Sequence, residues 1–123
     1  YCKENKILSL GISDTSNLCG ALEFSEKIVK CGTQPIIGTQ IIFKFEDQEG
    51  LLTLIAKNEQ GYRNMIELSS KSYLENDNLS KPHCDLNDLL DKNEGLIVMS
   101  GTINGLIGNL FNKGKFELIE DNY

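Results

Sequence analysis

The chain has 123 residues and a formal net charge of −6, and 40% of its residues are hydrophobic against 24% charged. This size and composition suit one ordinary globular domain, or part of a larger one. The 12 Lys and Arg residues are scattered among 18 Asp and Glu residues, which argues against a chain that holds nucleic acid by itself.

The four cysteines do not follow a zinc-binding pattern. No two of them form a C-x-x-C pair, and His83 is the single histidine, whereas structural zinc sites use closely spaced pairs of soft ligands. We therefore expect reduced thiols that mostly fill the core, at Cys2, Cys19, Cys31 and Cys84. No apolar run approaches the ~18 residues of a membrane span, so the chain is expected to be cytoplasmic.

The first third of the chain predicts a strand, a helix and a second strand. The apolar run Ile7–Ser13 is typical of a strand buried on both faces, and it stops at Asp14. Apolar residues then recur at helical spacing from Leu18 to Val29, and Gly32 is a fitting stop. A strand follows from Ile36 to Phe45, interrupted at Gly38. Strand, helix and strand in this order indicate the βαβ unit of a parallel sheet.

The rest of the chain continues the alternation. An acidic turn at residues 46–50 precedes an apolar strand over Leu51–Ala56, and Asn58 is placed to cap a helix that runs to about Glu75. The pattern then predicts, in order, an exposed loop at Asn76–Pro82, a short helix at Asp85–Asp91, a buried strand at Gly95–Ser100, a glycine-rich turn over Gly101–Gly108 and a helix at Leu106–Asn112 ended by Gly114.

Several residues carry competing interpretations. Asp14 is either a helix cap or a metal ligand at the end of a strand. His83, Cys84 and Asp85 contain nucleophile and base types, but adjacent residues rarely face one another, so a solvated loop histidine is favoured over catalysis. Tyr62 and Tyr73 lie three helical turns apart and are expected to pack in the core. The glycine-rich turn lacks the Lys-Ser/Thr ending of a phosphate-binding loop.

A family resemblance rests on phrases that occur in register along nearly the whole chain. They are Gly11–Asn17 leading into Gly20–Phe24, then Gln34–Gly38, Leu54–Asn58 with Gly61–Asn64, Ser70–Tyr73, and Gly95–Gly101. In this order and at this spacing the chain resembles the polymerase and histidinol phosphatase (PHP) domain. It is most similar to the PHP domain of bacterial replicative polymerases, the DNA polymerase III alpha subunits.

The resemblance implies an α/β fold, a distorted β/α barrel of alternating parallel strands and helices. Residues 1–123 would be a partial PHP domain, an incomplete arc of that barrel within a larger replicative polymerase chain. The family's first strand, which carries a His-x-His pair, and the polymerase domains would lie outside this chain. The absence of an initial Met fits the same interpretation, that the chain is a segment of something longer.

The metal site of active family members can be compared position by position. Such members are metal-dependent phosphoesterases whose ligands sit at strand ends. By resemblance, Asp14 is a possible relic ligand. The other positions appear without their metal donors by the same resemblance. Thr15 and Leu51 stand where active members have histidines, and Gln40 stands where they have a glutamate. Thr102 stands where several members offer a further ligand. We therefore predict a degraded site, no cofactor for this chain and no catalytic residue on it, with Mg²⁺ expected for the parent polymerase.

Two functions from different classes remain. The first is a metal-free structural and docking module of a replicative DNA polymerase, whose partners by resemblance are the epsilon proofreading exonuclease and other replicase subunits. DNA would be contacted only through the polymerase parts outside this chain. The alternative is a metal-dependent PHP phosphoesterase or 3′–5′ exonuclease. A decaying reading frame without separate function is a third possibility. A sheet that lacks its first strand exposes an edge or an apolar groove, so we expect the chain either to self-associate through that gap or to be only marginally stable alone.

Overall fold

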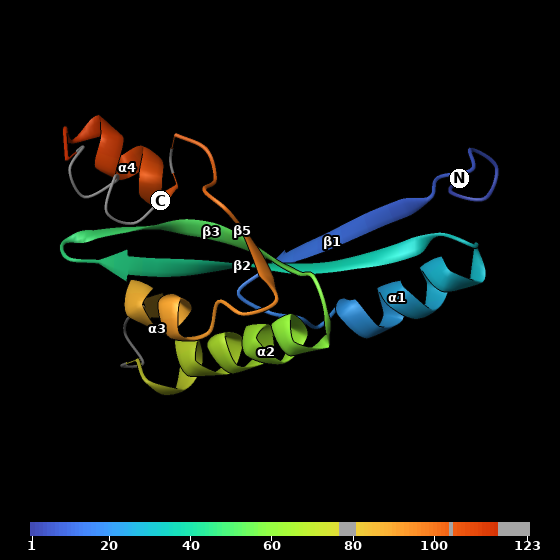
Figure 1. The fold of residues 1–123 in the computed structure, drawn as a ribbon, viewed down its shortest axis with the longest axis horizontal. Helices are drawn as coiled ribbons and strands as arrows, with labels where there is room; N and C mark the ends of the chain where they lie inside the picture. The colour runs from blue at the N-terminus through green and yellow to red at the C-terminus, as the bar shows by residue number, and fades with distance from the viewer. Residues whose placement is uncertain (77–80, 104, 116–123) are drawn as a thin grey trace.

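The computed structural model describes residues 1–76, 81–103 and 105–115, and its path is shown in Figure 1. The part of the predicted loop at residues 77–80 lies outside the described residues. The elements in chain order are β1 (Ser9–Thr15), α1 (Ala21–Lys30), β2 (Gln34–Phe45), β3 (Gln48–Ala56), α2 (Glu59–Leu74), β4 (His83–Asp85), α3 (Leu86–Asp91), β5 (Leu96–Met99) and α4 (Leu106–Asn112).

The strands form one mixed sheet in the order β1-β2-β3-β5, with β4 paired to β2. The predicted βαβ unit is confirmed, because β1 and β2 are parallel and α1 connects them. The expectation of parallel strands throughout is wrong for β3, which is antiparallel to both β2 and β5. The reason is the connection at Glu46–Asp47, which is a tight turn and leaves no room for the crossover that a parallel pair requires.

One face of the sheet carries the hydrophobic core. Ile41, Phe43 and Leu54 are fully buried on this helix-side face. They pack with buried side chains of α2, β4, α3 and α4, namely Met65, Leu68, Cys84, Leu86, Leu89 and Leu106. Figure 1 shows α1, α2 and α3 together along one side of the strands, while α4 lies beside the end where β2 turns into β3.

No described helix covers the opposite face, which we call the open face. Residues paired across neighbouring strands lie on the same face, so the register places a row of Thr15, Gln40, Thr53 and Met99 there. Around this row lie the apolar side chains Ile42, Leu51, Ile55 and Ile97. Leu51, Ile97 and Met99 are 38%, 49% and 51% exposed. The open face is therefore an uncovered, largely apolar sheet surface.

Two strands that the sequence predicts to be buried are exposed. β1 lies at the sheet edge, where Leu10 is 37% exposed and the preceding Leu8 is 84% exposed. β5 is likewise mostly exposed. The apolar runs correctly indicate strands, but burial on both faces needs a second covering layer, and the described residues supply one layer only.

The helix boundaries follow local capping chemistry. Asn58 caps α2 as expected, accepting a hydrogen bond from the Gly61 N–H at 2.9 Å. Asp85 and Asp88 form a capping box at the start of α3. Gly32 follows α1 with a φ of 75°, the left-handed conformation that a glycine stop provides. α1 begins later than the periodicity suggests, since Gly20 and not a residue near Asp14 is its N-cap.

Several side chains do not lie where the sequence places them. Tyr62 and Tyr73 are exposed on α2 and do not belong to the core, because its inward face is formed by other residues, Gly61, Asn64, Met65, Leu68 and Ser72. Cys84 is buried as predicted, but Cys19 and Cys31 are exposed and Cys2 is half-buried. Among the helices of the described residues, none has both the length and the apolar character needed to cross a membrane.

Candidate functional site

Asp14 is the next-to-last residue of β1, and its carboxylate is turned toward the helices. Its Oδ2 accepts a hydrogen bond from the Gly20 N–H at 3.2 Å, directly before α1. Thr39 supports the same junction, since its hydroxyl lies 2.9 Å from the carbonyl oxygens of both Asp14 and Asn17. Asp14 therefore satisfies a backbone donor at the helix start, although from six positions before the N-cap and not as the cap residue.

Thr15 points to the opposite face and meets Gln40 there. The two residues are register partners on β1 and β2. The Thr15 hydroxyl donates to the side-chain oxygen of Gln40 at 3.1 Å. This bond occupies the amide oxygen, which is the atom of Gln40 best suited to bind a cation. The bond thus joins the last residue of β1 to the middle of β2.

Leu51 and Thr102 share a cavity with Gln40. A cavity of about 920 Å³ opens between β3, β5, α3 and α4, and all three residues line it. Its other walls are mainly apolar, with Leu86, Leu89, Val98, Met99, Leu106 and Leu110 among them. The structure thus brings Gln40, Leu51 and Thr102 to one place and joins Thr15 to them through Gln40. It places the Asp14 carboxylate on the other face of the sheet.

The donor atoms at these five positions do not converge on one point. A multi-metal phosphoesterase site needs several carboxylate or imidazole donors converging on one point. Here the alkyl side chain of Leu51 has no donor atom, and the single carboxylate among the five positions faces away from the others. Over the described ranges, no three His, Cys, Asp or Glu residues gather closely enough to hold a cation.

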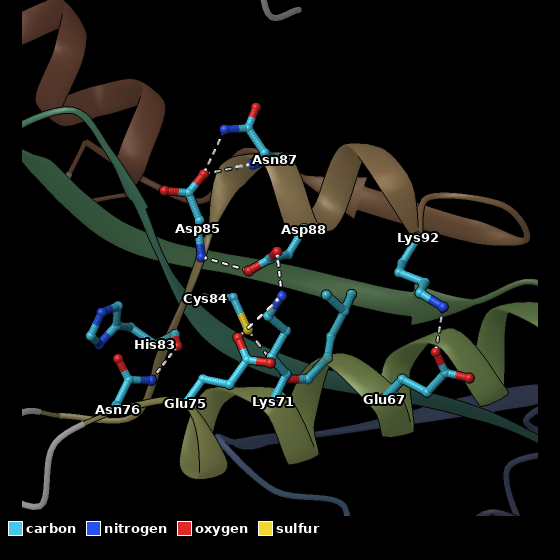
Figure 2. A network of polar contacts seen from close by, with 11 residues as sticks. Glu67, Lys71, Glu75, Asn76, His83, Cys84, Asp85, Asn87, Asp88 and Lys92 are labelled. Atoms are coloured by element: carbon cyan, nitrogen blue, oxygen red, sulfur yellow. Dashed lines mark hydrogen bonds and ion pairs between the residues drawn. The ribbon is translucent and has the colours of Figure 1, made fainter.

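A second polar cluster links α2, β4 and α3 (Figure 2). The Lys71 ammonium lies 2.7 Å from Asp88 Oδ1 and 3.2 Å from Glu75 Oε2. These two carboxylates, Asp88 first, raise the pKa of Lys71 above its ordinary value. The other oxygen of Asp88 accepts the Asp85 N–H at 3.0 Å. The Lys71–Asp88 pair holds α3 against α2, while the Lys71–Glu75 pair lies within the last turn of α2, so the arrangement is that of a structural ion-pair network.

The residues His83, Cys84 and Asp85 form β4, a strand that the sequence pattern does not reveal. The expectation of a solvated loop histidine is wrong, because His83 is half-buried and pairs with Ile42 of β2. Alternation along the strand sends Cys84 inward, where its thiol donates to the Leu68 carbonyl at 3.2 Å. Asp85 caps α3. The three side chains therefore do not converge as a nucleophile and base.

Burial raises the pKa of the Cys84 thiol to about 11, from an ordinary value of 9.0. We expect Cys84 to react with a thiol reagent at pH 8 about 100-fold more slowly than an ordinary cysteine, because its thiolate fraction falls by that factor. Since the folded thiol holds its proton more tightly, its contribution to stability is complete below pH 9 and declines as the pH rises toward 11.

The measurement is the time course of cysteine modification by the thiol reagent, in native buffer and in urea. The exposed Cys19 and Cys31 serve as internal references, and the variant Cys84→Ser should remove the slow phase alone. A native Cys84 that reacts as fast as these references would contradict its place in the core.

Comparison with known proteins assigns the chain to a family. The sequence profile of the PHP domain matches residues 1–123. The chain is 37% identical over 122 residues to the DNA polymerase III subunit alpha of Pasteurella multocida, covering 97% of this chain and 10% of that protein. It is 39% identical over 105 residues to the corresponding subunit of Rickettsia felis, covering 85% of this chain and 9% of that protein. The chain thus spans about a tenth of the length of these relatives.

Among solved structures, a protein from Bifidobacterium adolescentis described as a metal-dependent phosphoesterase shows a partial likeness. Its TM-score is 0.40 at 18% sequence identity, over 58% of this chain and 26% of that chain.

Proposed function

The chain belongs to the PHP domain family, and we propose that it is part of a DNA polymerase III alpha subunit that acts in bacterial chromosome replication. The proposal is supported by the family match over residues 1–123 and by relatives of that name that are 34–39% identical. Polymerase chemistry, its Mg²⁺ ions and the contacts with DNA would belong to parts outside these residues, because the chain corresponds to about a tenth of such a subunit.

Within that subunit, we propose that this domain is a metal-free docking module for the epsilon proofreading exonuclease. The observation that carries the proposal is the set of side chains at the positions where active family members, by resemblance, bind metal. Leu51 offers an alkyl group, and Gln40 is hydrogen-bonded to Thr15. A domain with a packed core but no converging set of metal donors is better suited to binding a partner by its shape than to phosphoester chemistry.

The alternative function, a phosphoesterase or 3′–5′ exonuclease, needs a set of donors that can polarise a phosphoryl oxygen and deprotonate water. The cavity next to Gln40 and Leu51 is large enough for a phosphate ester, but its walls are mainly apolar, and no carboxylate or imidazole lines it among the residues that the structure describes. The arrangement of side chains therefore favours the docking module.

The test measures metal content, hydrolysis and partner binding on the same preparation. The chain is incubated with Mn²⁺ or Zn²⁺, freed of excess ion and assayed for bound metal and for cleavage of a model phosphodiester. Binding to the epsilon subunit of the same organism is measured by calorimetry. We expect no stoichiometric metal, no hydrolysis above buffer and a saturable complex with epsilon.

A matched variant sharpens the comparison. Thr15→His, Gln40→Glu and Leu51→His together return donor atoms to the three positions without touching the helix-side core. If the wild-type chain binds metal as tightly as this triple variant and hydrolyses the phosphodiester, the metal-free interpretation fails. A folded chain that forms no complex with epsilon would overturn the docking role independently of the metal result.

A further inference from the structure

Residues 83–92, which we call the β4–α3 segment, are attached to α2 by charged side chains along one side of that helix (Figure 2). The Lys71 ammonium lies 2.7 Å from a carboxylate oxygen of Asp88 in α3. One helical turn earlier on α2, a carboxylate oxygen of Glu67 lies 2.6 Å from the ammonium of Lys92, which follows α3. Two ion pairs therefore connect this segment to a helix that is distant in sequence from neither end of it.

The β4–α3 segment has few other contacts that hold it to the fold. β4 is three residues long and pairs only with β2 among the described strands. α3 has six residues, too few for a helix that persists without packing. Three side chains of the segment, Cys84, Leu86 and Leu89, enter the core. A unit of this size can open at a lower free energy than the whole domain unfolds.

Asp88 is the residue through which the ion pair with Lys71 controls the start of α3. One of its oxygens bonds to Lys71 and the other accepts the Asp85 N–H at 3.0 Å. The Asp88 side chain is only 18% exposed, so removing the lysine leaves a largely buried carboxylate without its cation. The pair between Lys92 and Glu67 is about half exposed and contributes less.

We propose that the β4–α3 segment opens as one unit while α2 and the β2–β3 hairpin stay folded, and that Lys71 holds it closed. Opening moves Leu86 and Leu89 away from the cavity next to Leu51, because both leucines line it. Opening also exposes the thiol of Cys84, which is buried in the closed state. The α3 side of the cavity is thus a movable wall that one lysine keeps in place.

The test is amide hydrogen exchange of the whole chain in Lys71→Met, which keeps the aliphatic part of the side chain and removes its charge. We expect exchange in residues 86–92 to become about tenfold faster, while the amides of β2 and β3 keep their wild-type rates. Lys27→Met is the matched control. Lys27 pairs with Glu23 on α1, where both side chains are more than 70% exposed, so this change should leave the β4–α3 segment as it is in the wild type.

Three further measurements separate a latch from a general loss of stability. Asp88→Asn keeps an acceptor for the Asp85 N–H but removes the charge, and it should speed exchange in the same residues as Lys71→Met does. Lys71→Arg keeps the charge and should preserve the wild-type rates. In Lys71→Met, Cys84 should react with a thiol reagent faster by the same factor as the amides of α3 exchange.

Circular dichroism confirms that each variant is folded before its exchange is interpreted. If Lys71→Met speeds exchange in β2 and β3 as much as in α3, the segment does not open separately and the proposal is wrong. Unchanged exchange of α3 in both Lys71→Met and Asp88→Asn would overturn it as well, because the ion pair would then not hold the segment. A Cys84 thiol that stays as slow as in the wild type while α3 exchanges faster would show that β4 does not open with α3.

Discussion

Replacing Gly61 by Ala should destabilise the fold by about 2–4 kcal/mol, because the added methyl group has no space. A Cβ at this position would lie 1.8 Å from the Gly95 carbonyl oxygen and 2.4 Å from its carbon. Both atoms belong to the backbone, and they are held in place since the Lys57 N–H donates to the same oxygen at 2.8 Å. The clash can be relieved only by moving α2 away from the turn before β5.

The expected loss exceeds the gain in helix propensity from Gly to Ala, which is about 1 kcal/mol. Gly11→Ala is the matched control, since the nearest atom to its Cβ would be 3.7 Å away. That change should stay within about 0.5 kcal/mol of wild type. Urea unfolding followed by circular dichroism measures both. Equal stabilities for the two variants would show that the contact between α2 and Gly95 is not formed.

Truncating Leu54 to Ala should lower the free energy of unfolding by about 2–5 kcal/mol. Leu54 is fully buried at the centre of the sheet, between Thr39 of β2 and Val98 of β5. Its removal takes apolar atoms out of the main core cluster and leaves a cavity that the strand backbone cannot collapse to fill. Because domains of this size are stable by only about 5–15 kcal/mol, the variant could unfold near body temperature.

Leu22→Ala is the corresponding control on the surface. Leu22 is 71% exposed in the first turn of α1, and Ala is the better helix former, so the change should stay within about 0.5 kcal/mol. The two variants remove the same atoms and differ only in where those atoms lie. A loss at Leu22 as large as the loss at Leu54 would mean that the chain buries α1 against another surface in solution.

Local sequence signals determined most of the elements. The helix cap Asn58 acts at the position that the sequence indicates, since a short polar side chain can satisfy the free backbone donors at the start of a helix. α4 spans the predicted residues Leu106–Asn112, with a glycine stop at Gly114. These features depend on neighbours within a few positions, and such interactions are already encoded in the order of the residues.

The candidate site could be predicted only in part. The five positions Asp14, Thr15, Gln40, Leu51 and Thr102 come from family resemblance, and the structure gathers all of them except the Asp14 carboxylate near one end of the sheet. The position of a residue in a strand tells which face of the sheet its side chain occupies only when the register of that strand is known. Asp14 and Thr15 point in opposite directions because successive side chains alternate along a strand. A register shift of one residue would exchange their faces.

The sequence by itself determined the α/β class, the βαβ unit and the cap of α2 at Asn58. Only the tertiary structure decided that β3 runs antiparallel, that His83–Asp85 forms a strand, and that β1 and β5 are exposed. An apolar residue indicates that its side chain favours burial. Which segment covers that side chain depends on contacts between parts of the chain that are distant in sequence. Those contacts place one covering layer over the described residues and leave the open face and the β1 edge unpaired.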